Sequence, residues 1–151
     1  ILKNTIFEYC CFREMEDNML ENFVKVADMP QEVIEKYKDQ VPAELLQIWQ
    51  EDGLGTFLDA YLKVINPDDY LELLQDSYFR GDVAFPMFVT AFGDIITWEK
   101  NEFVGIVKYN LQDCDIIIKS LKYFIQYYRR FNTRSHKFVP PKTKRLFGWY
   151  R

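Results

Sequence analysis

Three segments with β-strand character follow one another in the middle of this chain, and no helical segment separates them. They cover residues 85–92, 94–99 and 102–109, where β-branched and aromatic side chains dominate. Strands that are sequence neighbours usually pair, and short connections make such pairs antiparallel. Because helical periodicity dominates the residues before them, we expect an α+β protein and not a doubly wound α/β fold. In it, N-terminal helices pack on a small antiparallel sheet.

The N-terminal half predicts a series of short helices. Residues 18–27 place Leu20, Phe23 and further apolar residues at helical spacing, which predicts the first of these helices. Pro30 and Pro42 each stand where the first residue of a helix belongs. We therefore expect three helices before residue 53.

A fourth helix is expected from Asn66 to about residue 80. Asn66 is a suitable cap, and the two Asp residues after Pro67 offset the positive end of the helix dipole. Residues 57–65 predict one further strand. Residues 114–118 fit either a strand or the start of a helix, and residues 120–130 predict a C-terminal helix.

The segment AFGDIITWEKN, residues 91–101, predicts a turn, a short strand and a hairpin turn. Asp94 follows a glycine and is expected to accept backbone hydrogen bonds in the first turn. Asn101 can adopt the left-handed conformation that a tight hairpin requires. Trp49 and Trp98 are both expected in the core, since each lies among apolar neighbours.

The sequence contains no recognisable catalytic, cofactor-binding or metal-binding motif. His136 is the only histidine, and it lies apart from any Ser, Cys or carboxylate cluster. No apolar run approaches the roughly 18 residues of a membrane-spanning helix, and the start does not resemble a signal peptide. Cys10, Cys11 and Cys114 are odd in number and have no metal-type partner nearby, which predicts reduced thiols and a cytoplasmic location.

Charge is distributed very unevenly along the chain. Residues 1–128 contain all 23 acidic residues and 11 of the 19 Lys and Arg, whereas residues 129–151 contain eight basic residues and no acidic one. An acidic body repels phosphate and attracts a basic partner, although acidity also serves solubility alone. The basic, aromatic tail can suit single-stranded nucleic acid, or it can dock on the acidic body.

Three motifs follow one another along the chain: VPAELLQIWQEDGLGTF (Val41–Phe57), VINPDDY (Val64–Tyr70) and TAFGDIITWEKN (Thr90–Asn101). In this order they resemble the GAD-like domain of bacterial immunity proteins. The layout is also similar to the SUKH-type immunity superfamily. The resemblance implies an N-terminal extension over residues 1–18, a GAD-like domain over 19–130, and over 131–151 either a basic tail or the start of a linker to a missing second domain.

The resemblance further implies a non-enzymatic protein that binds and neutralises a toxin, such as a DNase of a type VI secretion system. A nuclease must be basic where it holds phosphate, so an acidic binding surface suits it. From turn placement we predict that the contacting acids are Asp52, Asp59, Asp82, Glu99 and Glu102. An enzyme of unknown type, or a nucleic-acid module that uses the basic tail, is the alternative.

Overall fold

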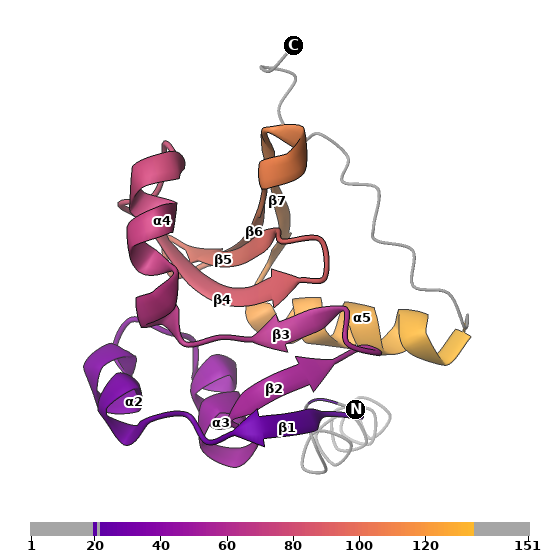
Figure 1. Cartoon of the computed structure of the whole chain (residues 1–151). Coiled ribbons are helices and arrows are strands. Elements are labelled where there is room, and N and C mark those ends of the chain that lie inside the picture. The colour runs from indigo at the N-terminus through magenta and orange to yellow at the C-terminus, as the bar shows by residue number, and fades with distance from the viewer. Residues whose placement is uncertain (1–19, 21, 135–151) are drawn as a thin grey trace, which may run out of the picture.

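A seven-stranded antiparallel sheet forms the centre of the computed structural model, which describes residue 20 and residues 22–134 (Figure 1). The strands lie in the sheet in the order of the sequence, and each pairs with the next. They are β1 (Val24–Ala27), β2 (Leu54–Phe57), β3 (Leu62–Val64), β4 (Ala84–Thr90), β5 (Ile95–Glu99), β6 (Phe103–Lys108) and β7 (Asp113–Lys119). The predicted α+β class and antiparallel pairing are confirmed, but the sheet is larger than expected.

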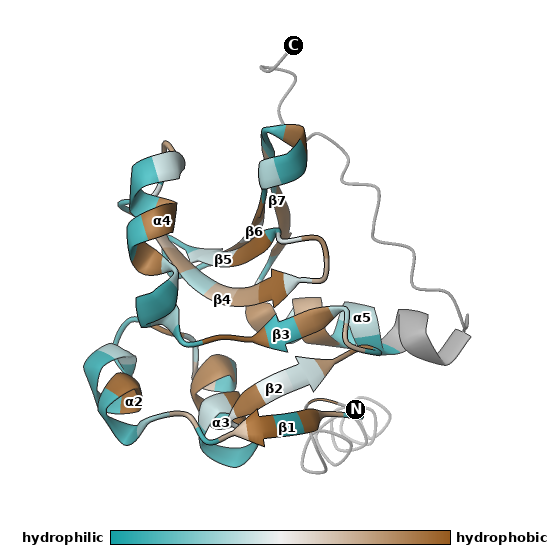
Figure 2. Cartoon of the chain, in the orientation of Figure 1, coloured by the Kyte–Doolittle hydropathy of each residue, from teal (hydrophilic) through white to brown (hydrophobic). Residues whose placement is uncertain are grey.

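Helices cover both faces of this sheet. The described α-helices are α2 (Gln31–Tyr37), α3 (Ala43–Glu51), α4 (Leu71–Ser77) and α5 (Leu121–Arg134). Two short 3₁₀ helices, η1 (Pro67–Asp69) and η2 (Tyr109–Leu111), lie in the connections. The helices alternate between hydrophilic and hydrophobic segments, as expected for elements with one buried side (Figure 2).

The two faces of the sheet bury two separate hydrophobic cores. The larger core lies between the sheet and the helices α2, α3 and α5, where Phe88 stacks on Phe124 with ring centroids 6.2 Å apart. The smaller core lies beneath α4 and contains Leu74, Tyr78 and Ile95. The helices are therefore divided between the faces, whereas the sequence predicted N-terminal helices packed on a small sheet.

Strand β1 replaces the helix predicted over residues 18–27. Its residues pair with β2, and Val24 and Val26 are exposed. Gly55 makes the close approach of the two strands possible, because a Cβ atom there would lie 2.2 Å from the Val24 carbonyl oxygen. Leu20 and Phe23 still pack against the larger core, as expected for apolar residues. Their spacing predicted a helix, however, and this segment forms a strand.

Residues 57–65 form parts of two strands and not one. A tight loop separates β2 from β3, and Leu58, Asp59 and Ala60 all have positive φ, between 52° and 65°. The amide of Tyr61 closes the loop by donating to the Leu58 carbonyl over 3.0 Å. No glycine marks this reversal, so a sequence pattern based on glycine misses it.

Other helix starts are confirmed to within one residue, whereas the single helix predicted from Asn66 to about residue 80 is two shorter ones, η1 and α4. Helices α2 and α3 begin directly after Pro30 and Pro42, and the Asn66 side chain accepts from the Asp68 amide at the start of η1. The ambiguous residues 114–118 belong to strand β7. In α4, the apolar side chain of Leu73 is exposed.

The motif over residues 91–101 folds largely as predicted. Lys100 and Asn101 adopt the left-handed conformation, and the Glu102 amide donates to the Glu99 carbonyl over 3.1 Å to close the hairpin. In the preceding turn, the hydroxyl oxygen of Thr90 accepts the amide of Asp94 over 3.1 Å. Thr90 thus performs the capping role that we predicted for Asp94.

Candidate functional site

Besides Glu99, which ends β5 there and is described below, three of the five predicted contact acids lie at one end of the sheet. Asp52, Asp82 and Glu102 come shortly before β2, β4 and β6, and these three strands run in the same direction because each is separated from the next by one antiparallel strand. We call this end of the sheet the pocket end, after the pocket described below. Asp59 follows β2 and therefore lies at the opposite end.

The three acids at the pocket end do not form one cluster. Strands β2 and β6 are four positions apart in the sheet, which corresponds to about 19 Å. Glu102 is also engaged already, in an ion pair with Lys119. Asp52 is half-buried, and burial together with the nearby Glu51 raises its pKa. This leaves Asp82, which precedes the central strand β4, as the acid best placed to contact another protein.

Asp82 lines a pocket of about 370 Å³ at this end. The floor consists of aromatic rings from two neighbouring strands, Phe85 and Trp98, which are each 7% exposed. The rim is polar and exposed, with Asp39, Asp82 and Lys100 as its charged members. The side chain of Asp82 makes no hydrogen bond or ion pair with any residue that the structure describes.

Glu99 was predicted to be an exposed contact residue, and this is wrong because its side chain is 0% exposed. It points into the smaller core from the last position of β5. Its Oε1 accepts from the Tyr78 hydroxyl over 2.9 Å and from the Thr97 hydroxyl over 3.0 Å. Its Oε2 pairs with the Arg80 guanidinium. A buried carboxylate is tolerated only with such partners.

Gly105 provides the space that the Glu99 carboxylate occupies. It lies opposite Thr97 in the pairing of β5 with β6. A Cβ atom at this glycine would lie 2.7 Å from both Glu99 Oε1 and Thr97 Oγ1. The buried polar network therefore depends on a missing side chain in the neighbouring strand.

The Glu99 network holds together the two walls of the pocket. Arg80 directly precedes Gly81 and Asp82 on one wall, while Glu99 directly precedes Lys100 on the other. A backbone hydrogen bond of 3.3 Å from the Lys100 amide to the Val83 carbonyl adds a second link. Glu99 is thus a positioning residue for the pocket and not a contact residue.

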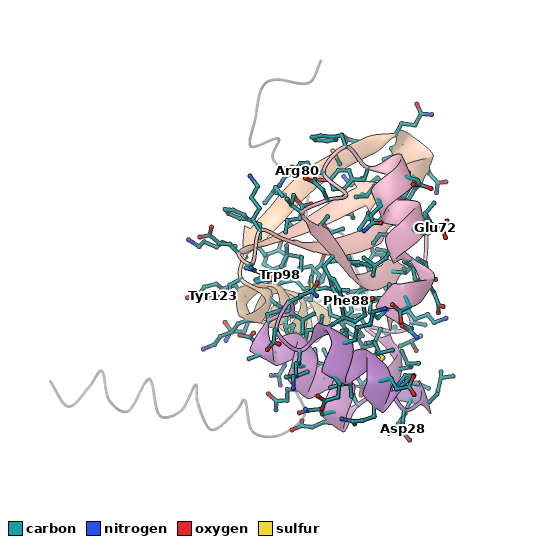
Figure 3. All side chains as sticks on the ribbon, turned by 90° about the vertical axis from the view of Figure 1, so that its left-hand side faces the viewer. Asp28, Glu72, Arg80, Phe88, Trp98 and Tyr123 are labelled. Carbon is teal, nitrogen blue, oxygen red and sulfur yellow. The ribbon has the colours of Figure 1, made fainter. Side chains whose placement is uncertain are left out.

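Exposed apolar side chains lie in the elements beside the pocket. Leu73 belongs to α4, and Phe79 and Val83 belong to the segment between α4 and β4. Figure 3 looks onto this side of the molecule, with Glu72 on α4, Arg80 after that helix and Trp98 on β5. Of the three apolar residues, Val83 lines the pocket, so an exposed apolar side chain accompanies the acidic rim, as in many protein interfaces.

The features expected of an enzyme do not coincide with this pocket. In the described part of the chain, the carboxyl groups with raised pKa are those of Asp52 and Asp94, in both cases chiefly through burial, and neither lines the pocket. Within residues 20 and 22–134, no group of three or more His, Cys, Asp or Glu is arranged to hold a metal ion. His136, Cys10, Cys11 and the basic tail beyond residue 134 lie outside the described residues.

Several residues of the site were not identified from the sequence. Tyr78 and Arg80 follow a helix that ends at Ser77, and nothing local signals that both reach a carboxylate some twenty positions later. Asp39 was overlooked because it lies in the α2–α3 connection, far from Asp82 in sequence. Glu99 was identified from the sequence, but its position at the end of a strand did not show that its side chain is buried.

This architecture defines an α+β domain with a sequential antiparallel sheet and an acidic, aromatic pocket at one end. The family model of the GAD-like domain matches residues 12–110, and the chain belongs to this family. Among solved structures, the fold is similar to that of Atu4351 from Agrobacterium tumefaciens, with a TM-score of 0.61 and 19% identity. The likeness covers 77% of this chain and 58% of that one. No curated protein matches the chain. None of the described helices is long and apolar enough to cross a membrane.

Proposed function

We propose that this protein is a non-enzymatic immunity domain that binds a basic toxin protein through the pocket end. The observation that carries the proposal is the pocket itself, which the exposed acids Asp39 and Asp82 line together with Phe85, Trp98 and the exposed Val83. Aromatic anchors with a charged, accessible rim are typical of protein-binding surfaces. The toxin is proposed to be a nuclease of a type VI secretion system, in keeping with the family resemblance of the motifs.

The charge of the folded body supports a basic partner. Residues 22–128 contain 18 Asp and Glu but only nine Lys and Arg. Of these acidic side chains, only Glu99 is buried. A surface of this sign accelerates association with a cationic protein and repels the phosphates of nucleic acid. Neutralisation would then follow from steric and electrostatic occlusion of the toxin's phosphate-binding surface.

The test uses the protein encoded by the adjacent gene, co-expressed and then titrated against this chain by calorimetry. We expect rescue from toxicity, and an affinity that weakens as salt rises from about 50 to 300 mM, because exposed charges are screened. Reversing the rim charge by Asp82→Lys should weaken binding about tenfold or more, since like charges would then face each other.

The matched control is Asp113→Lys, an exposed charge reversal at the opposite end of the sheet. It should change the affinity less than about twofold, because it lies beyond a Debye length from the pocket end. A toxin that still kills in the presence of this protein would refute the proposed function. Equal losses for the two variants would refute its assignment to the pocket end.

A further inference from the structure

We propose that the pocket accepts a single arginine side chain from the partner protein. This inference rests on the proposed function and names the group that the partner inserts. At about 370 Å³, the pocket lies near the lower limit of small-ligand sites, which run from roughly 300 to 1,000 Å³. It is therefore large enough for one long side chain and too small for a helix or a strand.

The floor of the pocket suits a flat cation. Phe85 and Trp98 come from the adjacent strands β4 and β5, where they form a directly opposed pair. Both residues line the pocket, and each is 7% exposed. A guanidinium group stacks on aromatic rings. It is also less strongly hydrated than an ammonium group, so it loses less hydration free energy when it leaves water.

The rim provides the opposite charge from two separate connections. Asp39 comes from the α2–α3 connection and Asp82 from the α4–β4 connection, so the two carboxylates approach the pocket from different elements. Among the described residues, Lys100 is the only cationic side chain that lines it, which leaves an excess of one negative charge. Carboxylates bind guanidinium groups in a planar, bidentate manner that an ammonium group cannot match.

Other occupants fit this chemistry less well. An anionic group would face two carboxylates, and a purely apolar side chain would desolvate them without giving them a partner. A guanidinium group satisfies both the aromatic floor and the acidic rim. The walls are also held in place before binding, through the buried Arg80–Glu99 pair and the link from Lys100 to Val83, and such preorganisation lowers the cost of binding.

The experiment titrates the whole chain with N-acetyl-arginine amide and follows the assigned amide and indole resonances by NMR. We expect saturable shifts at the indole of Trp98 and at the amides of Gly81 and Asn101. The citrulline analogue has nearly the same shape without the charge, and it should bind at least about fivefold more weakly, as expected when a charge-assisted contact is lost. The lysine analogue should also bind more weakly.

Two variants and a control locate the site. Asp82→Asn and Asp39→Asn should each weaken arginine-amide binding about threefold, whereas Asp113→Asn should leave it unchanged. Equal binding of the citrulline analogue, or shifts confined to other regions, would overturn the inference. Because the probe contains no toxin, its failure leaves the toxin-binding assay intact. Conversely, a chain that binds the probe but no toxin would refute the proposed function alone.

Discussion

Removing Arg80 is expected to destabilise the protein through the carboxylate that it leaves behind. Glu99 is 0% exposed, and without Arg80 its Oε2 atom has no hydrogen-bond or ion-pair partner among the described residues. Breaking a buried ion pair from one side costs about 3–5 kcal/mol. Because the Arg80 side chain is 28% exposed, water can reach the vacated space, and we expect Arg80→Met to cost about 3 kcal/mol.

The complementary change, Glu99→Gln, keeps the shape but removes the charge. It weakens the hydrogen bonds from Tyr78 and Thr97, and hydrogen bonds to charged groups contribute about 1.5–3 kcal/mol. We expect a loss of about 2 kcal/mol, since Arg80 can still turn towards water. In the double variant the costs overlap, and a total of about 3 kcal/mol instead of 5 would give a coupling energy of about 2 kcal/mol.

The assay is urea unfolding at neutral pH, followed by far-UV circular dichroism for the four proteins of the cycle. For a chain of this size, about 3 kcal/mol should also lower the melting temperature by roughly 6–12 °C. The control cycle is Lys36→Met with Asp68→Asn, an ion pair whose side chains are 59% and 40% exposed. Its coupling should stay below about 1 kcal/mol.

Additive costs at Arg80 and Glu99, within about 0.5 kcal/mol, would refute this reasoning, since residues that share a buried pair cannot be independent. An Arg80→Met variant that loses less than about 1 kcal/mol would contradict it as well, because an uncompensated buried carboxylate cannot be that inexpensive.

Two further predictions concern the same network. Gly105→Ala should lower the free energy of unfolding by about 1–3 kcal/mol through overpacking, because its methyl group would lie 2.7 Å from Glu99 Oε1. Denaturant midpoints measure this loss, and an unchanged midpoint would contradict the prediction. The pKa of Tyr78 is raised, mainly by burial and to a smaller extent by the negative charge of Glu99. This raised pKa contributes stability that is fully present below the ordinary value of about 10 and is lost as the pH rises through the folded value. Tyr78→Phe should therefore lower stability at pH 7 and flatten its decline above pH 10, and unfolding midpoints at both pH values test this. The exposed Tyr123→Phe serves as the control, and an unchanged slope for Tyr78→Phe would refute the prediction.

Local sequence rules predicted the elements whose signals lie within a few residues. Pro30 and Pro42 mark helix starts because proline fixes φ and needs no amide partner there. Asn101 marks a hairpin because it tolerates a left-handed backbone. The same rules failed at β1, because pairing with a strand some thirty positions later overrides the spacing of a few apolar residues.

The candidate site was predicted less well than the fold. Asp82 was chosen from its turn and does line the pocket, whereas Glu99 was chosen by the same reasoning and is buried. The position of Glu99 at the end of a strand is compatible with an exposed or a buried side chain. Only the positions of Tyr78, Arg80 and Gly105 decide between them, and these residues belong to other elements.

The sequence by itself determined the α+β class, the antiparallel pairing of β4 to β6, the tight turn at Lys100 and Asn101, and the acidic character of the body. These properties depend on composition and on contacts between near neighbours. Tertiary structure alone decided which acids are accessible and which is buried, and it alone brought Asp39, Asp82 and Trp98 to one pocket. The physical reason is that the burial of a charge and the shape of a cavity depend on every element packed around them, and those elements come from distant parts of the chain.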